Sequence, residues 1–235
     1  MKKAIVIPGL GGTEDCWASL FTSRLRTGFS VQSMALPSKG HTISEFSEIL
    51  MPDKPVDLLV GFSMGAAVVL EMLVRNPGAA SHAVLMAPPA GNHLPQPPEE
   101  AYDFNLGRAK WAASMLEMMF TPNWLAAHPD VTEFFPRVSK PVAVELLIMQ
   151  SNAIRNWEGC LTKLGNTILP VLVLAGRYDI ITPLVHAETI SQTLSNASLS
   201  VFDTGHGFPW QCPLETANMI MEFSNENTGT DFTGS

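Results

Sequence analysis

One serine in this sequence is flanked by glycines at the spacing of a sharp turn between a strand and a helix. Ser63 is the central residue of the pentapeptide 61–65, which fits the pattern G-x-S-x-G. The apolar run 56–60 before it is typical of a buried strand, and residues 66–75 after it are typical of a helix. Such a turn leaves no room for a Cβ at either glycine and lifts the serine hydroxyl clear of the sheet, above a helix N-terminus that favours developing negative charge. This context predicts a nucleophile.

A serine hydroxyl is a poor nucleophile unless a base takes its proton and a carboxylate orients that base. Asp179 follows the apolar run 171–176, and His206 lies between two glycines after the run 198–203. Both residues come directly after predicted strands, in the chain order serine, acid, histidine. The competing acid is Asp203, which is nearer to His206 in sequence but belongs to the strand end. We interpret Ser63, Asp179 and His206 as nucleophile, orienting acid and base.

An attacking serine produces an oxyanion, which needs two N–H donors. One is expected from the backbone of Met64, the residue after the nucleophile. The other is expected from the glycine-rich loop 8–12, with Leu10 as the best donor. The remaining histidines are interpreted as structural or solvated, although a place for His41 at the mouth of a pocket stays open as an alternative.

Six apolar runs predict the strands that must position these residues: 3–8, 30–36, 56–62, 82–87, 171–176 and 198–203. Helical patterns alternate with the first four runs, link the last two and follow the last one. Alternation with crossovers of this length predicts an α/β fold with one doubly wound, mostly parallel sheet. Ligands bind such sheets beyond the carboxyl ends of the strands, where every candidate catalytic residue falls.

The alternation stops between residues 88 and 166. This segment begins with proline-rich turns and has no strand pattern, but it carries helical patterns at 100–120, 122–127 and 141–154. Because it is too long for a simple loop, we predict a helical lid over 88–166, inserted into a core formed by 1–87 and 167–224. The polar tail 225–235 is expected to be disordered.

The predicted lid is rich in large apolar side chains, and several of them should roof an apolar acyl pocket above the serine. The side chains that we expect at the substrate are Met115, Met119, Phe120 and Trp124. Packing within the lid itself is the alternative for each. Basic side chains on the same segment leave docking of an acyl-carrier-linked substrate open: Arg108, Lys110, Arg137, Lys140 and Arg155.

Composition and charge restrict the class of protein. The chain has 235 residues, of which 46% are hydrophobic and 15% charged, as is typical of a compact globular domain. The formal net charge of −8 argues against a nucleic-acid partner, and no apolar run is long enough to span a membrane. The three cysteines, Cys16, Cys160 and Cys212, are an odd number, which favours a reducing, cytoplasmic location. Because they also have no metal-like spacing, neither a metal nor another cofactor is expected.

Three elements of the sequence together resemble the α/β-hydrolase superfamily: residues 61–65, 176–183 and 205–208. The loop 8–12 is also similar to the His-Gly oxyanion loop of that family, with Pro8 in the place of the histidine. The resemblance covers essentially the whole chain, except that the usual first two strands of the family have no counterpart. It implies an α/β-hydrolase fold with a shortened sheet of about six strands and an inserted helical lid.

Within the superfamily, the short lid and the last two loops resemble small serine esterases, enol-lactonases and pimeloyl-ester carboxylesterases. This resemblance implies hydrolysis of a carboxylic ester, lactone or thioester with an apolar acyl part through an acyl-enzyme. Residues 9–17 are also similar to the menaquinone-pathway synthase, which implies lyase or C–C hydrolase chemistry with the same triad as an alternative. A non-catalytic small-molecule receptor of the same fold is a further alternative.

Overall fold

The computed structural model describes residues 1–130, 142–165 and 167–226. At its centre lies a six-stranded sheet with the order β2-β1-β3-β4-β5-β6, in which every neighbouring pair of strands is parallel. All six predicted runs form strands: β1 (Lys2–Ile7), β2 (Phe29–Ser33), β3 (Val56–Phe62), β4 (Ala80–Met86), β5 (Val171–Gly176) and β6 (Ala197–Phe202). The predicted parallel α/β sheet is therefore confirmed.

The central strands are buried on both faces, which explains why their sequences are continuous apolar runs rather than alternating ones. In the register of the sheet, Val60 of β3 lies between Val6 of β1 and Val84 of β4. Branched side chains fit such a pleated, covered surface well. The edge strand β6 is only partly buried, which agrees with its mixed sequence.

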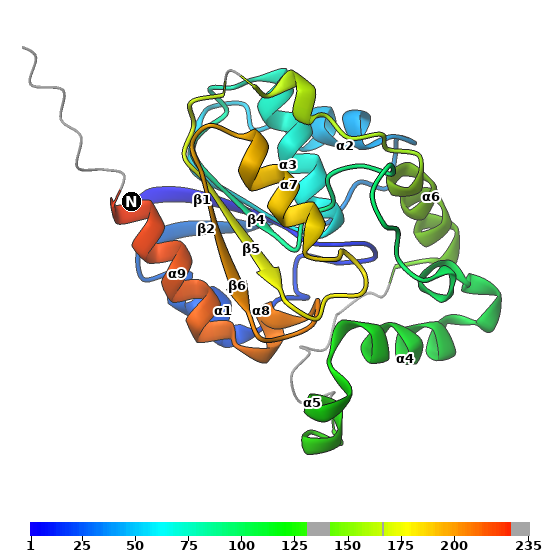
Figure 1. Ribbon diagram of the computed structural model, residues 1–235. Coiled ribbons are helices and arrows are strands. Elements are labelled where there is room, and N and C mark those ends of the chain that lie inside the picture. The colour runs from blue at the N-terminus through cyan, green and yellow to red at the C-terminus, as the bar shows by residue number, and fades with distance from the viewer. Residues whose placement is uncertain (131–141, 166, 227–235) are drawn as a thin grey trace, which may run out of the picture.

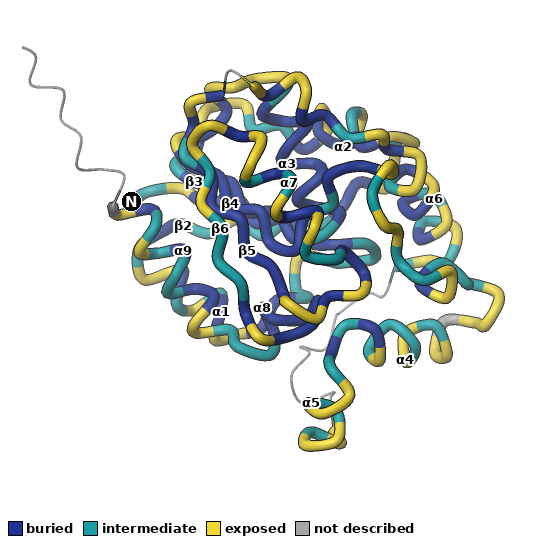
Figure 2. Tube along the Cα trace, in the orientation of Figure 1, coloured by how far each residue is buried: buried dark blue, intermediate teal, exposed yellow. Residues whose placement is uncertain are grey.

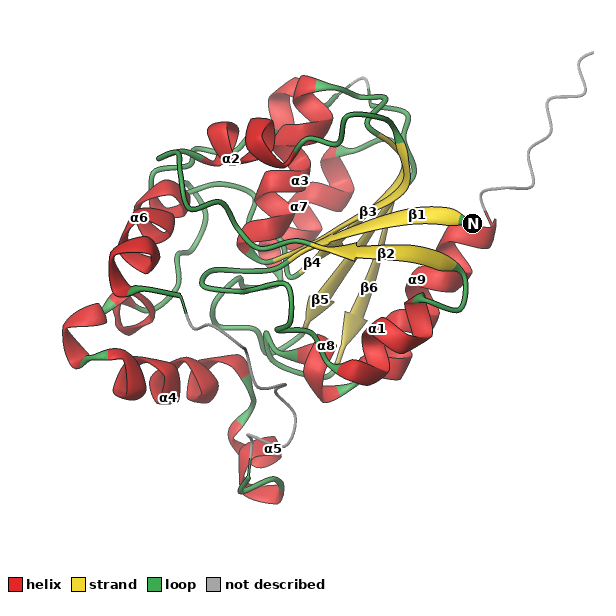
Figure 3. Ribbon diagram, turned by 180° about the vertical axis from the view of Figure 1, so that it is seen from behind, coloured by secondary structure: helices red, strands yellow, loops and turns green. Residues whose placement is uncertain are grey.

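Two layers of helices cover the sheet (Figure 1 and, from behind, Figure 3). One face carries α2 (Ile43–Leu50), α3 (Met64–Arg75) and α7 (Val185–Thr193), and the other carries α1 (Ser19–Leu25), α8 (Phe208–Gln211) and α9 (Pro213–Glu226). Each layer packs its apolar side chains against the sheet in a separate buried cluster. Figure 2 shows the burial concentrated in the strands and in the inner sides of these helices.

The residues between β4 and β5, here called the β4–β5 segment (87–170), form no strand in their described part. Their helices and helical turns are η1 (Glu99–Tyr102), η2 (Phe104–Leu106), α4 (Arg108–Met119), α5 (Pro122–Ala127), α6 (Val144–Arg155) and η4 (Leu161–Lys163). In Figure 1, α4 and α5 project from the body on the side to which the strands point. The helix predicted over 100–120 is interrupted because Gly107 has a φ of 76°, a conformation that does not continue a helix.

Some predictions concern residues outside the described part of the chain, namely Arg137, Lys140 and most of the tail. Within 1–130, 142–165 and 167–226, no helix has the length and apolar character needed to cross a lipid bilayer.

Candidate functional site

Ser63 lies on the turn between β3 and α3, with a φ of 53° and a ψ of −119°. A positive φ is strained for a residue with a Cβ, and it persists only where the surroundings enforce it. Here the Ser63 N–H donates to the Met86 carbonyl at 2.8 Å. A Cβ on Gly61 would collide with the backbone at Gly65, and one on Gly65 would collide with backbone carbonyls at the end of β1. Close backbone packing therefore enforces the turn predicted around the serine.

Asp179 and His206 follow neighbouring strands, β5 and β6, so their loops lie side by side. Asp179 Oδ2 lies 2.7 Å from His206 Nδ1, and both residues are almost completely buried. Asp179 Oδ1 accepts hydrogen bonds from the backbone N–H groups of Ile181 and Thr182, each at 2.8 Å. The carboxylate is thus fixed on both oxygens. This arrangement favours a proton on Nδ1 and leaves Nε2 as a hydrogen-bond acceptor.

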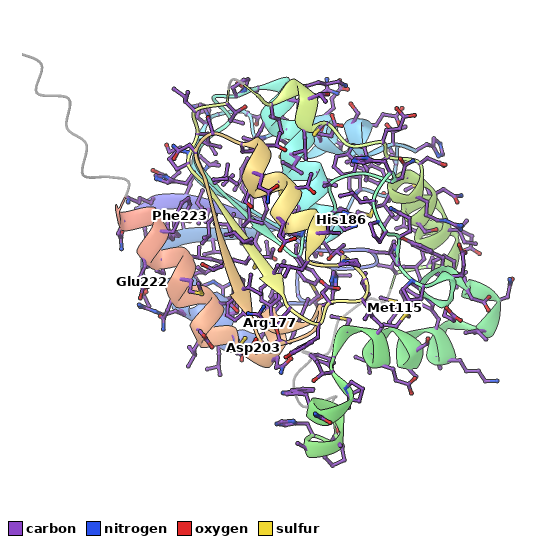
Figure 4. The ribbon with its side chains drawn as sticks, viewed as in Figure 1. Met115, Arg177, His186, Asp203, Glu222 and Phe223 are labelled. Carbon is purple, nitrogen blue, oxygen red and sulfur yellow. The ribbon has the colours of Figure 1, made fainter. Side chains whose placement is uncertain are left out.

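The competing acid, Asp203, lies on the surface. Its side chain is 78% exposed and pairs with Arg177 Nε at 2.7 Å. Figure 4 shows the two labelled side by side where β5 and β6 end. The structure therefore gives His206 a carboxylate partner in Asp179.

Thr182 is a residue of this site that sequence reasoning missed. Its Oγ1 lies 2.8 Å from Asp179 Oδ2 and 3.1 Å from the carbonyl oxygen of Ala87. Ala87, at the end of β4, is strained with a φ of 46°. Thr182 therefore links the acid to the neighbouring strand end. The signal that could have found it was Asp179, because an Asp in a turn typically accepts hydrogen bonds from backbone N–H groups a few residues further along the chain.

The loop after β1 packs directly against the serine. The Gly12 N–H donates to the Gly9 carbonyl at 2.9 Å, which closes a tight turn over Leu10 and Gly11. A Cβ on Gly9 would lie only 3.1 Å from the Cβ of Ser63, so glycine lets the main chain approach. Both predicted oxyanion donors, Leu10 and Met64, line the same cavity as Ser63.

This cavity has a volume of about 370 Å³ and is also lined by His206. It lies at the small end of the range for sites that bind small molecules. The β4–β5 segment covers it mainly with apolar and aromatic side chains, among them Tyr102, Trp111, Ala112, Met115, Met119, Ile154 and Trp157. Within the described ranges, its lining contains no lysine and no arginine. Figure 4 shows Met115 on the side of α4 that faces the body of the protein.

Of the four side chains predicted at the substrate, Met115 and Met119 line the cavity. Phe120 and Trp124 are not among its described lining residues. Because α4 ends at Met119, Phe120 has an extended backbone and no longer follows the helical spacing. Its ring is buried against the His206 loop, where a Cβ on Gly207 would lie 2.6 Å from it. Trp124 stacks on Phe120 with ring centroids 4.4 Å apart.

Cys16 and Tyr102 also line the cavity. Burial raises the pKa of the Cys16 thiol to about 12 and that of the Tyr102 hydroxyl to about 12. Both therefore stay protonated at neutral pH, and a protonated thiol is a weak nucleophile. Among the residues that the structure describes, no three His, Cys, Asp or Glu side chains are grouped so as to hold a metal ion.

His186 of α7 anchors the beginning of the β4–β5 segment. Its Nδ1 accepts a hydrogen bond from the Ala90 N–H at 3.0 Å, and its Nε2 lies 2.8 Å from the Pro95 carbonyl. Both bonds are satisfied by the neutral imidazole with its proton on Nε2. Burial lowers the pKa of His186 below its ordinary value, which stabilises this neutral form.

The lowered pKa of His186 predicts that stability declines in mild acid. The unfolded chain takes up this proton near the ordinary pKa of about 6.5, whereas the folded protein takes it up only at lower pH. The contribution of neutral His186 to the free energy of unfolding is therefore complete above about pH 6.5 and is lost as the pH falls toward the folded pKa. Between pH 7 and about pH 5, the unfolding free energy of His186→Gln should therefore fall less steeply than that of the parent, by up to about 1.4 kcal/mol per pH unit. Urea unfolding at several pH values measures this slope.

His82 provides the matched control, because burial also lowers its pKa but its ring lies against Phe223 of α9. His82→Gln should leave the amide hydrogen exchange of residues 88–97 unchanged in acid. His186→Gln should remove any acid-induced acceleration there. Identical pH slopes in the parent and His186→Gln would contradict this role of His186.

Comparison with known proteins identifies the family. A family model described as the alpha/beta hydrolase family matches residues 4–219. The pimeloyl-[acyl-carrier protein] methyl ester esterase of Aromatoleum aromaticum is 24% identical in an alignment 248 positions long, which covers 93% of this chain and 96% of that protein. The AB hydrolase superfamily protein YisY of Bacillus subtilis is 24% identical in an alignment 181 positions long, which covers 72% of this chain and 66% of YisY.

Solved structures agree in fold. The enol-lactonase from Burkholderia xenovorans has a TM-score of 0.80 at 17% identity, with 96% of this chain and 92% of that chain covered. A thermophilic esterase from Thermogutta terrifontis has a TM-score of 0.73 at 18% identity, with 96% and 90% covered. At these identities the likeness shows the fold. Since the family model spans most of its length, the chain belongs to the alpha/beta hydrolase family.

Proposed function

We propose that this protein is a serine hydrolase that cleaves a carboxylic ester with an apolar acyl part. One arrangement carries the proposal. The strained Ser63 and His206 line the same apolar cavity, and His206 is paired with the buried Asp179. This combination supports a Ser-His-Asp triad. Strain at a single residue and a buried carboxylate each cost stability, and both are accounted for by this chemistry.

In the proposed mechanism, His206 takes the Ser63 proton as Oγ attacks the acyl carbonyl, and Asp179 stabilises the imidazolium that results. The backbone N–H groups of Leu10 and Met64 stabilise the oxyanion, and we call residues 9–12 the oxyanion loop. His206 then protonates the departing alcohol, and water attacks the acyl-enzyme by the same route to release the acid. Among the described side chains, Ser63 Oγ and His206 are not hydrogen-bonded; such contacts often tighten only when substrate binds.

The lining of the cavity supports a small, neutral, apolar acyl group. Its described walls are largely aromatic and aliphatic and carry no Lys or Arg to pair with a second carboxylate. The β4–β5 segment acts as a lid over this pocket, with residues 88–166 as its proposed extent. Lactones and thioesters undergo the same acyl transfer, and the relatives include an enol-lactonase and a methyl ester esterase by name.

We keep a substrate attached to an acyl carrier as an alternative to a free ester. Of the basic residues predicted to serve it, Arg155 is ion-paired with Glu99 at 3.3 Å, which reduces the charge that it offers. The three free cysteines support a cytoplasmic location for the protein.

The proposed function is tested by hydrolysis of p-nitrophenyl acetate, butyrate and hexanoate by the purified protein. We expect turnover with release of equal amounts of nitrophenol and carboxylic acid. Saturable binding of these esters without turnover would instead identify a receptor of the same fold. Elimination products from other substrates, together with inactivity on all esters, would indicate a lyase.

Met119 and Phe120 form a natural pair for testing the acyl pocket, because they are adjacent but only Met119 lines the cavity in its described part. Met119→Ala should change the preference between acetate and hexanoate esters by up to about fourfold for each substrate methylene that is no longer buried, since one buried CH₂ contributes about 0.8 kcal/mol. Phe120→Leu should leave this preference unchanged and lower the melting temperature. A chain-length profile that shifts with Phe120→Leu but not with Met119→Ala would contradict the assignment of the pocket wall.

A further inference from the structure

A buried glutamine joins the β4–β5 segment to the oxyanion loop. Gln150 lies on α6 and is only 1% exposed. Its Oε1 accepts a hydrogen bond from the Gly11 N–H at 3.0 Å, across 139 residues of sequence. Gln150 is not among the described residues that line the cavity, so its contact is with the loop rather than with a bound substrate.

The bond selects one of two conformations of the oxyanion loop. The turn closed by Gly12 and Gly9 has Gly11 at its third position with a φ of 70°, as in a type II turn. Type I and type II turns differ by a flip of the central peptide, and glycine permits both. A flip would turn the Leu10 carbonyl, instead of the Gly11 N–H, toward Gln150 Oε1. Gln150 Oε1 would then face a second acceptor unless the amide turned over to present its Nε2–H₂ group, so the bond from Gly11 to Oε1 favours the observed form.

Direct packing reinforces this selection. A Cβ on Gly11 would lie 2.6 Å from Leu147 Cδ2, one turn before Gln150 on α6. The helix therefore rests on the bare backbone of the loop. The Gly11 N–H is engaged by Gln150 and the Gly12 N–H by the Gly9 carbonyl, so the proposed mechanism assigns the oxyanion to the Leu10 N–H.

The β4–β5 segment is also hydrogen-bonded to the loop that contains His206. The Gly207 N–H donates to the Met119 carbonyl at 2.8 Å, next to His206. A Cβ on Gly205 would lie 2.6 Å from the same carbonyl oxygen. The segment is thus bonded to the backbone on two sides of the cavity.

We propose that Gln150 is a positioning residue that fixes the oxyanion loop, so that α6 contributes to the chemical step in addition to enclosing the substrate. The inference rests on the proposed ester hydrolysis. It predicts that the loss of Gln150 affects small and large substrates alike, because the oxyanion forms on every ester. A residue that only shaped the acyl pocket would affect long esters most.

Three variants test the role. Gln150→Met keeps the length of the side chain and removes its acceptor, whereas Gln150→Glu keeps an acceptor oxygen. Ser151→Ala is the matched control, because Ser151 is also buried on α6 but bonds only within its helix, to the Ile148 carbonyl at 2.9 Å. In Gln150→Met, kcat should fall about tenfold on both acetate and hexanoate esters at nearly constant KM, less than the loss of 10²–10³ expected when an oxyanion donor itself is removed.

Gln150→Glu should recover most of this kcat, and Ser151→Ala should match the parent. An unchanged kcat in Gln150→Met, a loss confined to KM, or an equal loss in Ser151→Ala would overturn the proposal. Hydrogen–deuterium exchange supplies a readout that does not depend on turnover. Exchange over residues 9–12 should accelerate in Gln150→Met and not in Ser151→Ala. If the parent hydrolysed no ester, the proposed function would fail, and unchanged exchange in Gln150→Met would separately overturn the positioning role.

Discussion

Ser63→Ala is expected to lower kcat for ester hydrolysis by a factor on the order of 10⁵ to 10⁶, because the nucleophile of a triad acts as a unit with its base. The substitution removes one oxygen and keeps the Cβ. The strain at a φ of 53° and the backbone contacts that enforce it are therefore unchanged. We expect the circular dichroism spectrum and the melting temperature to stay close to those of the parent.

Cys16 supplies the matched control for this result, since its thiol lines the same cavity. Burial keeps the Cys16 pKa at about 12, so the thiol is protonated at neutral pH. Cys16→Ala should retain most of the activity toward p-nitrophenyl acetate. Activity of Ser63→Ala within tenfold of the parent, or loss of activity in Cys16→Ala alone, would remove Ser63 from the mechanism.

Asp179→Asn is expected to lower kcat by a factor on the order of 10⁴, by analogy with the same change in serine proteases. The physical reason lies in the hydrogen bonds of the acid. Two backbone N–H groups point at Oδ1, so the amide oxygen of asparagine must occupy that position. The amide NH₂ then faces His206 Nδ1 and forces it to accept. The proton moves to Nε2, where the base is needed.

Asp203→Asn is the control for the acid. Its carboxylate pairs with Arg177 at the surface, and exposed ion pairs contribute little. We therefore expect kcat within about twofold of the parent, measured with the same ester. A large loss in Asp203→Asn with a small one in Asp179→Asn would reverse the assignment of the orienting acid.

The sequence was sufficient where local chemistry decides the structure. Apolar runs of strand length predicted all six strands, and Gly61 and Gly65 predicted the turn at Ser63. The placement of Asp179 beside His206 followed from a general property of parallel sheets, because both residues leave the carboxyl ends of strands that lie next to each other.

Contacts between distant segments left little trace in the sequence. Gln150 reaches Gly11 across 139 residues, and Trp157 Nε1 donates to the buried carboxylate of Glu71 at 2.8 Å across 86 residues. No periodicity and no motif in the sequence indicates either contact. The burial of Phe120 was not predictable for a related reason: it continues the apolar spacing of α4, but the helix ends one residue earlier, at Met119, and the Phe120 side chain is buried in the core.

The most direct test of the central claim is covalent labelling with a fluorophosphonate, which reacts with a serine only when a base and an oxyanion site activate it. The labelled protein is digested, and the modified peptide is identified by mass spectrometry. Our account predicts one added phosphonyl group on Ser63, with labelling lost in Ser63→Ala and strongly slowed in Asp179→Asn. Label on another residue, or equal labelling of the parent and Ser63→Ala, would contradict it.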